Sequence, residues 1–179
     1  GCARATERKS MQVEASFRVL DPGWRRLVAA LAAFCWTLAP AGELLEVPYP
    51  NLDSAEPAVR ATLESARASL DAMPAEADLA TAYGEMGELY HAHHVYVPAD
   101  SCYRNALALR PDDFRWHYYQ ARLMAQTGRP KEALAGYRRA AELRPDYAPA
   151  QLRLADAWLE ASRPDQAEPL YRNLIDDPG

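Results

Sequence analysis

Apolar residues between positions 54 and 74 recur with the period of a helix. After a stretch rich in prolines and acids at 42–53, apolar side chains follow one another at steps of three or four residues, at Val59, Leu63, Ala66 and Leu70. This spacing places them along one helical face. We therefore predict an extended linker over 42–53 and one amphipathic helix within 54–74, with Asp53 or Ser54 as its N-cap. A helix with a single apolar face is expected to pack on the segment that follows it.

From about residue 80 onward the pattern itself repeats every 34 residues. A shift of 34 residues superposes ALALRPDDFRW at 106–116 on AAELRPDYAPA at 140–150. The matched columns hold small residues at Gly87, Ala121 and Ala155 and at Ala99, Ala133 and Ala167, tyrosines at Tyr103, Tyr137 and Tyr171, and prolines at Pro111 and Pro145. Small side chains let two helices approach closely, and a proline ends a helix. The period therefore predicts stacked pairs of helices.

These columns resemble the tetratricopeptide repeat, with three units at 80–113, 114–147 and 148–179. The resemblance implies an all-α fold, a right-handed α-solenoid of antiparallel helix pairs, preceded by the amphipathic helix of 54–74. The sequence departs from the family pattern at His117 and Gln151, where the pattern prefers a large side chain. Leu174 also stands where the other units have alanine. We expect the second helix of the third unit to be incomplete.

The resemblance also implies a binding surface, because the first helices of such units line a concave groove that holds a peptide or a partner's helix. Repeat phase carries the groove-facing positions over to each unit. They are Thr81, Glu85, Glu88 and His91 in the first unit, Arg115, Tyr118, Tyr119, Arg122 and Gln126 in the second, and Pro149, Leu152, Arg153 and Asp156 in the third. The second unit groups aromatic and guanidinium side chains, which is typical of binding hot spots. In the alternative, Trp116, Tyr118 and Tyr119 pack against neighbouring helices.

The stretch YHAHHVYVPADSCY, at 90–103, raises the question of a metal site. His91 and His94 could share a helical face, but no third ligand is placed beside them, so no metal and no cofactor are predicted. Repeat phase places the histidines at the end of a first helix, where imidazoles can meet free carbonyl groups. Cys102 falls within a second helix, beside a packing tyrosine, and is expected in the core.

Charge and motifs narrow the class of function. The net charge of −5 disfavours a nucleic-acid partner. The sequence contains no glycine-rich phosphate loop, no CxxC pair and no nucleophile beside a histidine. The acid pairs Asp112-Asp113 and Asp176-Asp177 recur at turns, where they are expected to cap helices. The sequence therefore predicts a scaffold or adaptor for a protein or peptide, not an enzyme; the alternative is the regulatory or docking part of a larger exported enzyme.

The first 41 residues carry the pattern of a secretory signal peptide. Arg25 and Arg26 precede an apolar run at 27–39, and Ala39-Pro40-Ala41 follows as a cleavage motif. The run is shorter than the roughly 20 residues that span a bilayer. We therefore predict an exported bacterial protein, periplasmic or extracellular, without a stable membrane span after cleavage. The alternative is an N-terminal membrane anchor or a buried helix.

Overall fold

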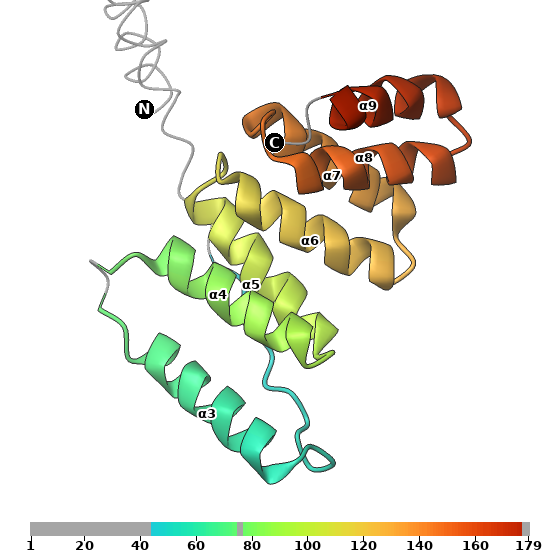
Figure 1. The fold of residues 1–179 in the computed structure, drawn as a ribbon. Helices are drawn as coiled ribbons and strands as arrows, with labels where there is room; N and C mark the ends of the chain where they lie inside the picture. The colour runs from blue at the N-terminus through green and yellow to red at the C-terminus, as the bar shows by residue number, and fades with distance from the viewer. Residues whose placement is uncertain (1–43, 75–76, 177–179) are drawn as a thin grey trace, which may run out of the picture. The chain divides into compact units, whose positions relative to one another are not determined.

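The computed structural model describes residues 44–74 and 77–176, and this part of the chain is all-α (Figure 1). The described residues belong to the second of two compact units, Glu43–Gly179. Their helices are α3 (Pro57–Asp71), α4 (Leu79–Ala92), α5 (Tyr96–Leu109), α6 (Phe114–Gln126), α7 (Pro130–Leu143), α8 (Ala148–Glu160) and α9 (Pro164–Asp176). From α4 onward they stack as helical hairpins, α4–α5, α6–α7 and α8–α9. The predicted all-α helical solenoid is confirmed, whereas the predicted signal peptide lies outside the described residues.

The turn inside each hairpin is set by one backbone position per period. His94, Gly128 and Ser162 have positive φ angles of 60°, 76° and 59°. The left-handed conformation at these positions lets the next amide donate back into the preceding helix, as the Val95 N–H does to the Tyr90 carbonyl at 2.9 Å. Glycine adopts this conformation without strain, whereas a histidine or serine is held there by the surrounding fold.

The turns between hairpins follow the predicted prolines. Helices α5 and α7 end two residues before Pro111 and Pro145. Asp113 caps α6 by accepting a hydrogen bond from the Arg115 amide at 3.1 Å, as predicted. Its neighbour Asp112 is not a cap, because it pairs with Arg139 across the turn. Asp176 is the last residue of α9, and Asp177 lies outside the described residues, so the capping role of this second pair stays a prediction.

Helix α6 lies between two hydrophobic cores and contributes to both. Trp116 and Leu123 of α6 join the first core, and Tyr118 and Ala121 of the same helix join the second. The other members of the first core come from residues 44–52 and helices α3, α4 and α5, and those of the second from α7 and α8. Cys102 is fully buried in the first core, as predicted.

Residues 44–52, here called the strap, have no regular secondary structure, in keeping with the predicted linker, but they are also part of the first core, which was not predicted. Val47 and Leu52 are buried. The Asn105 side-chain amide holds both backbone groups of Leu45: its Oδ1 accepts from the Leu45 N–H at 2.7 Å and its Nδ2 donates to the Leu45 carbonyl at 2.8 Å. Arg67 donates to the Val47 carbonyl at 3.0 Å.

The two ends of the described array differ from the sequence prediction in detail. Helix α3 begins later than expected, with Glu56 at the N-cap position and Pro57 in its first turn, so neither Asp53 nor Ser54 is the cap. Its predicted apolar stripe does pack on the first core. The third unit has its second helix, α9, which reaches Asp176 and buries Ala167. Over the part of the chain that the structure describes, no helix combines the length and hydropathy needed to cross a membrane.

Candidate functional site

Helices α4, α5 and α6 enclose a hollow of about 310 Å³. Its lining consists of Glu88, His91, Ala92, His94, Tyr103, Tyr119, Arg122 and Gln126. Five of these side chains had been assigned to the groove from repeat phase: Glu88, His91, Tyr119, Arg122 and Gln126. The structure therefore brings together groove positions of the first and second units. We call this space the α4–α6 hollow.

His91 forms a wall of the hollow, and each of its ring nitrogens faces a polar partner. Its side chain is buried. Because an amide oxygen only accepts, Nε2 of His91 donates to Oε1 of Gln126, at 2.8 Å. The remaining nitrogen, Nδ1, faces the Tyr103 hydroxyl at 3.4 Å. Burial lowers the pKa of His91 and the Gln126 hydrogen bond raises it, whereas the charges of Arg122 and His94 lower it further.

The imidazoles were expected to meet helix carbonyl groups. In the described part of the chain, neither the His91 nor the His94 ring does so. His94 instead hydrogen-bonds the Tyr96 hydroxyl through Nδ1 at 2.7 Å, while its backbone amide donates to the His91 carbonyl. His91 and His94 thus have different side-chain partners, and both rings contact Tyr96 edge-on. The described residues hold no group of three or more histidine, cysteine, aspartate or glutamate side chains placed to bind a metal ion.

Two opposite charges line the hollow. Within the described part of the chain, neither Glu88 nor Arg122 makes a hydrogen bond or a close ion pair, and the Arg122 guanidinium lies 6.0 Å from the centre of the Tyr118 ring. Burial raises the pKa of the half-buried Glu88, as does the charge of Glu85, while Arg115 and Arg122 lower it. Both charges thus lack a close partner among the described residues.

The adjacent residues Tyr118 and Tyr119 have different roles. Tyr119 is half-buried, lies parallel to the Tyr103 ring at 6.5 Å, and lines the hollow. Tyr118 is 8% exposed and packs against Tyr137 and Tyr147 in the second core. The groove assignment of Tyr118 is therefore corrected: it is a packing residue, as the alternative had it. Trp116 is also buried.

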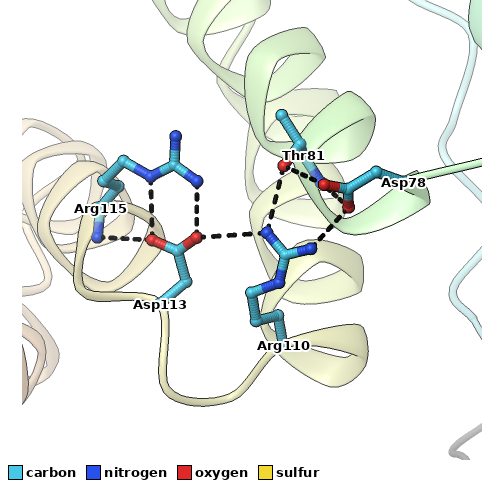
Figure 2. A network of polar contacts seen from close by, with 5 residues as sticks. All are labelled: Asp78, Thr81, Arg110, Asp113 and Arg115. Carbon is cyan, nitrogen blue, oxygen red and sulfur yellow. Dashed lines mark hydrogen bonds and ion pairs between the residues drawn. The ribbon is translucent and has the colours of Figure 1, made fainter.

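Arg115 and Thr81, also assigned to the groove region, are engaged in a polar network at the edge of the solenoid (Figure 2). Asp78 caps α4 and accepts from the Thr81 amide and, at 2.8 Å, from Arg110. Arg110 also lies 3.7 Å from Asp113, which accepts from Arg115 at 2.7 Å. The Arg110 hydrogen bond is the largest contribution lowering the pKa of Asp78 to about 2.

The groove positions of the third unit lie at a separate hollow of about 350 Å³, next to α7 and α8. Here Arg153 and Asp156 form an ion pair at 3.3 Å, and the Tyr171 hydroxyl donates to Asp156 at 2.8 Å. Leu152 is exposed on α8. The charged groups of the third unit are therefore largely satisfied by one another, unlike Glu88 and Arg122.

A third space was missed in the sequence: an apolar slot of about 230 Å³ between α3 and α4. Glu85, a predicted groove residue, lies at this slot and not at the α4–α6 hollow. The repeat period begins at about residue 80, so it gave no position on α3. The signal that could have found the slot is Met73, one turn beyond the stripe residue Leu70.

The fold and the hollows define a helical-repeat protein. Models of the family described as "Tetratricopeptide repeat" match residues 99–148 and 126–177. The matched residues include most of α5 and the hairpins α6–α7 and α8–α9, so this part of the chain is similar to tetratricopeptide repeats in sequence.

Solved structures of MamA are similar in fold. One is 16% identical with a TM-score of 0.58, covering 66% of this chain and 67% of that chain. A structure of MamA AMB-1 is 20% identical with a TM-score of 0.58, covering 68% and 64%. At these identities the likeness shows the fold alone. Among curated proteins, the peroxisomal targeting signal receptor of Eremothecium gossypii is 38% identical over 71 residues, which are 39% of this chain and 12% of that receptor.

Proposed function

We propose that the protein is an interaction scaffold that holds a peptide or an extended partner segment in the α4–α6 hollow. The observation that carries the proposal is the pair Glu88 and Arg122, two opposite charges without a close partner in the described part of the chain, on the walls of one concave space. Elsewhere in the described part, Arg115, Arg129 and Arg139 are all paired with carboxylates. A partly buried charge without a partner departs from the usual satisfaction of polar groups, and such departures are expected at functional sites.

The lining indicates the chemistry of the partner. An acidic side chain or a carboxylate would meet Arg122, and a basic side chain would meet Glu88 and, beyond it, Glu85. Tyr119 offers part of a flat ring held in place by its stack on Tyr103, which gives contact area at little cost in conformational entropy. A hydrogen bond to a charged group contributes about 1.5–3 kcal/mol, so one such contact is enough to select a sequence.

A random dodecapeptide display library selected on the purified protein tests the proposal. The affinities of synthesised selected peptides are then measured by fluorescence anisotropy for the wild type, Tyr119→Ala and Arg122→Ala. Loss of a hot-spot side chain costs more than about 1 kcal/mol, so about tenfold weaker binding is expected in each variant. Arg104→Ala, an exposed arginine on α5 outside the hollow lining, is the matched control. Unchanged affinity in both groove variants would reject the hollow as the binding site.

A second candidate is a docking or regulatory segment of a larger protein. The curated relative supports it, because the similarity to this chain covers only 12% of that receptor. In a larger protein with further repeats or a separate domain, the partner would bind in the same α4–α6 hollow. Neither candidate assigns a catalytic residue.

Export is a separate proposal that rests on residues 1–41. Expression in a bacterial host followed by N-terminal sequencing of the periplasmic fraction is expected to give a chain starting at Gly42. An uncut chain in the membrane fraction would support the anchor alternative instead.

A further inference from the structure

The apolar slot between α3 and α4 has a defined floor and mouth. Leu70 and Met86 form part of its lining and are 8% and 4% exposed, while Met73 at 42% lies open to solvent. Leu89 lies half-buried beside them. The slot measures about 230 Å³, below the roughly 300–1,000 Å³ of pockets that enclose whole small molecules. Its size and lining suit a single aliphatic or thioether side chain, and methionines adapt readily to such a guest.

Two carboxylates on α4 separate this slot from the α4–α6 hollow. Glu85 lines the slot and Glu88 lines the hollow. They stand three residues apart on one helix face, where like charges destabilise a helix by about 0.2–0.5 kcal/mol. Within the described residues neither carboxylate has a hydrogen-bonded or close ionic partner, and the charge of Glu85 helps to raise the pKa of Glu88. The Arg115 charge acts on both carboxylates without a close contact to either, and a cation placed between them would relieve the repulsion further.

We propose that the partner segment carries a leucine or methionine that enters the α3–α4 slot and, close to it in sequence, a lysine or arginine that lies over Glu85 and Glu88. This inference rests on the proposed function and narrows its partner class. The slot, the two carboxylates and the hollow follow one another across α4, so a single extended segment can contact all three. Its order would be an apolar residue, then a basic one, then an acidic one facing Arg122.

The test uses the peptides from the dodecapeptide selection and two further protein variants. Glu85→Gln removes one charge and keeps the side-chain size, whereas Met73→Lys places a cation and a polar end at the mouth of the slot. Glu64→Gln, an exposed glutamate on α3 outside the slot, is the matched control. Unchanged thermal unfolding of each variant shows that the fold is intact.

We expect the selected peptides to contain leucine or methionine within about four positions of a lysine or arginine. Partly exposed charge pairs contribute little individually, so Glu85→Gln should weaken binding by about two- to fivefold, and Met73→Lys by at least as much. Replacing the peptide's basic residue with glutamine should remove the effect of Glu85→Gln.

The two proposals fail in different ways. In one outcome, peptide affinity falls in Tyr119→Ala and Arg122→Ala but is unchanged in Glu85→Gln and Met73→Lys. This would overturn the proposal for the slot and leave the scaffold proposal in place. A selection that yields no peptide sensitive to Tyr119→Ala or Arg122→Ala would overturn both.

Discussion

At the first junction of the solenoid, where α6 packs on the α4–α5 hairpin, the large residue comes from the following unit. Trp116 of α6 lies directly over Gly84 of α4, and a Cβ at Gly84 would come within 2.3 Å of the indole. At the second junction the same two positions of the period hold Tyr118 and Ala150, both buried. The large residue now comes from the preceding unit and the small one from the following unit. The repeat thus preserves the combined size of the pair and not the identity of either member.

The edges of the two junctions differ in a similar way. At the first, Arg110 joins the carboxylates of Asp78 and Asp113 (Figure 2). At the second, the equivalent arginine, Arg144, pairs with Asp146 at 3.0 Å and lies 5.1 Å from the centre of the Phe114 ring, which itself contacts Tyr147 edge-on. A guanidinium can bind both a carboxylate and an aromatic face, so the same arginine position holds two carboxylates at the first junction and one carboxylate and one ring at the second.

The largest expected effect on stability comes from removing the indole at the first junction. Trp116→Ala removes a buried tryptophan and should lower the free energy of unfolding by about 3–5 kcal/mol, measured by urea denaturation. Ala150→Gly, at the equivalent position of the second junction, should cost only about 1 kcal/mol. Similar losses of unfolding free energy in Trp116→Ala and Ala150→Gly would contradict the finding that the large residue comes from opposite sides of the two junctions.

The next effect is steric. Gly84→Ala should destabilise the protein by about 1–3 kcal/mol, although alanine is intrinsically the better helix former, because its methyl group overlaps the indole. In the Trp116→Ala background the same substitution should be neutral or stabilising. A double-mutant cycle of unfolding free energies measures this coupling, and additive effects would show that the indole is not the obstacle.

A smaller effect depends on pH. The folded-state pKa of Asp78 is about 2, below the ordinary value of 3.8, so its charge stabilises the folded state above about pH 4. That contribution should be lost as the pH falls from about 4 to about 2. Asp78→Asn keeps a competent N-cap but removes the charge, so its melting temperature should fall less than that of the wild type over this range. Parallel profiles of the two proteins would exclude the Asp78–Arg110 contact as a source of acid sensitivity.

The smallest effect concerns a polar contact that only the first junction has. Gln120 donates to Asp100 at 3.0 Å, and Asp100 also pairs with Arg129 at 3.3 Å, whereas the residues equivalent to Asp100 and Gln120 at the second junction are Leu134 and Leu154. The double substitution Asp100→Leu/Gln120→Leu should change the free energy of unfolding by less than about 1 kcal/mol, because a partly exposed polar contact contributes little. Urea denaturation at low salt and at 1 M NaCl should show that the free energy of unfolding depends less on salt in this double variant than in the wild type. A loss of several kcal/mol would mean that the junctions are not interchangeable.

Much of the scaffold follows from the 34-residue period. It located the closely packed columns, which are buried at Ala99, Ala133 and Ala167, and it placed His94, Gly128 and Ser162 at one turn position, where all three have positive φ. These features are local, since each depends on residues within one period. The period alone is therefore enough to predict them.

The side-chain details of the groove could not be predicted in this way. Whether Tyr118 or Tyr119 is buried depends on the residue that meets it from another helix. The first junction pairs Trp116 with Gly84, whereas the second pairs Ala150 with Tyr118, and neither helix of a pair indicates this difference by its own sequence. Arg115 was assigned to the groove by phase, but its guanidinium is bound by the N-cap Asp113 two residues earlier. The strap was missed because its nine residues show no helical period. Its buried partner Asn105 has Arg139 and Asn173 at the equivalent positions, so this polar column did not indicate a packing residue.

The strap has a consequence for how the protein folds. Its hydrogen bonds join Leu45 and Asn105, 60 positions apart, whereas the bond between His91 and Gln126 of neighbouring units spans 35. A repeat array forms through nearest-neighbour contacts, and closing a longer loop costs more conformational entropy. Docking of the strap should therefore be a late step that follows formation of the α4–α5 hairpin. Its release should be an early opening of the native state, visible as faster hydrogen exchange at the Leu45 amide than at amides within α5.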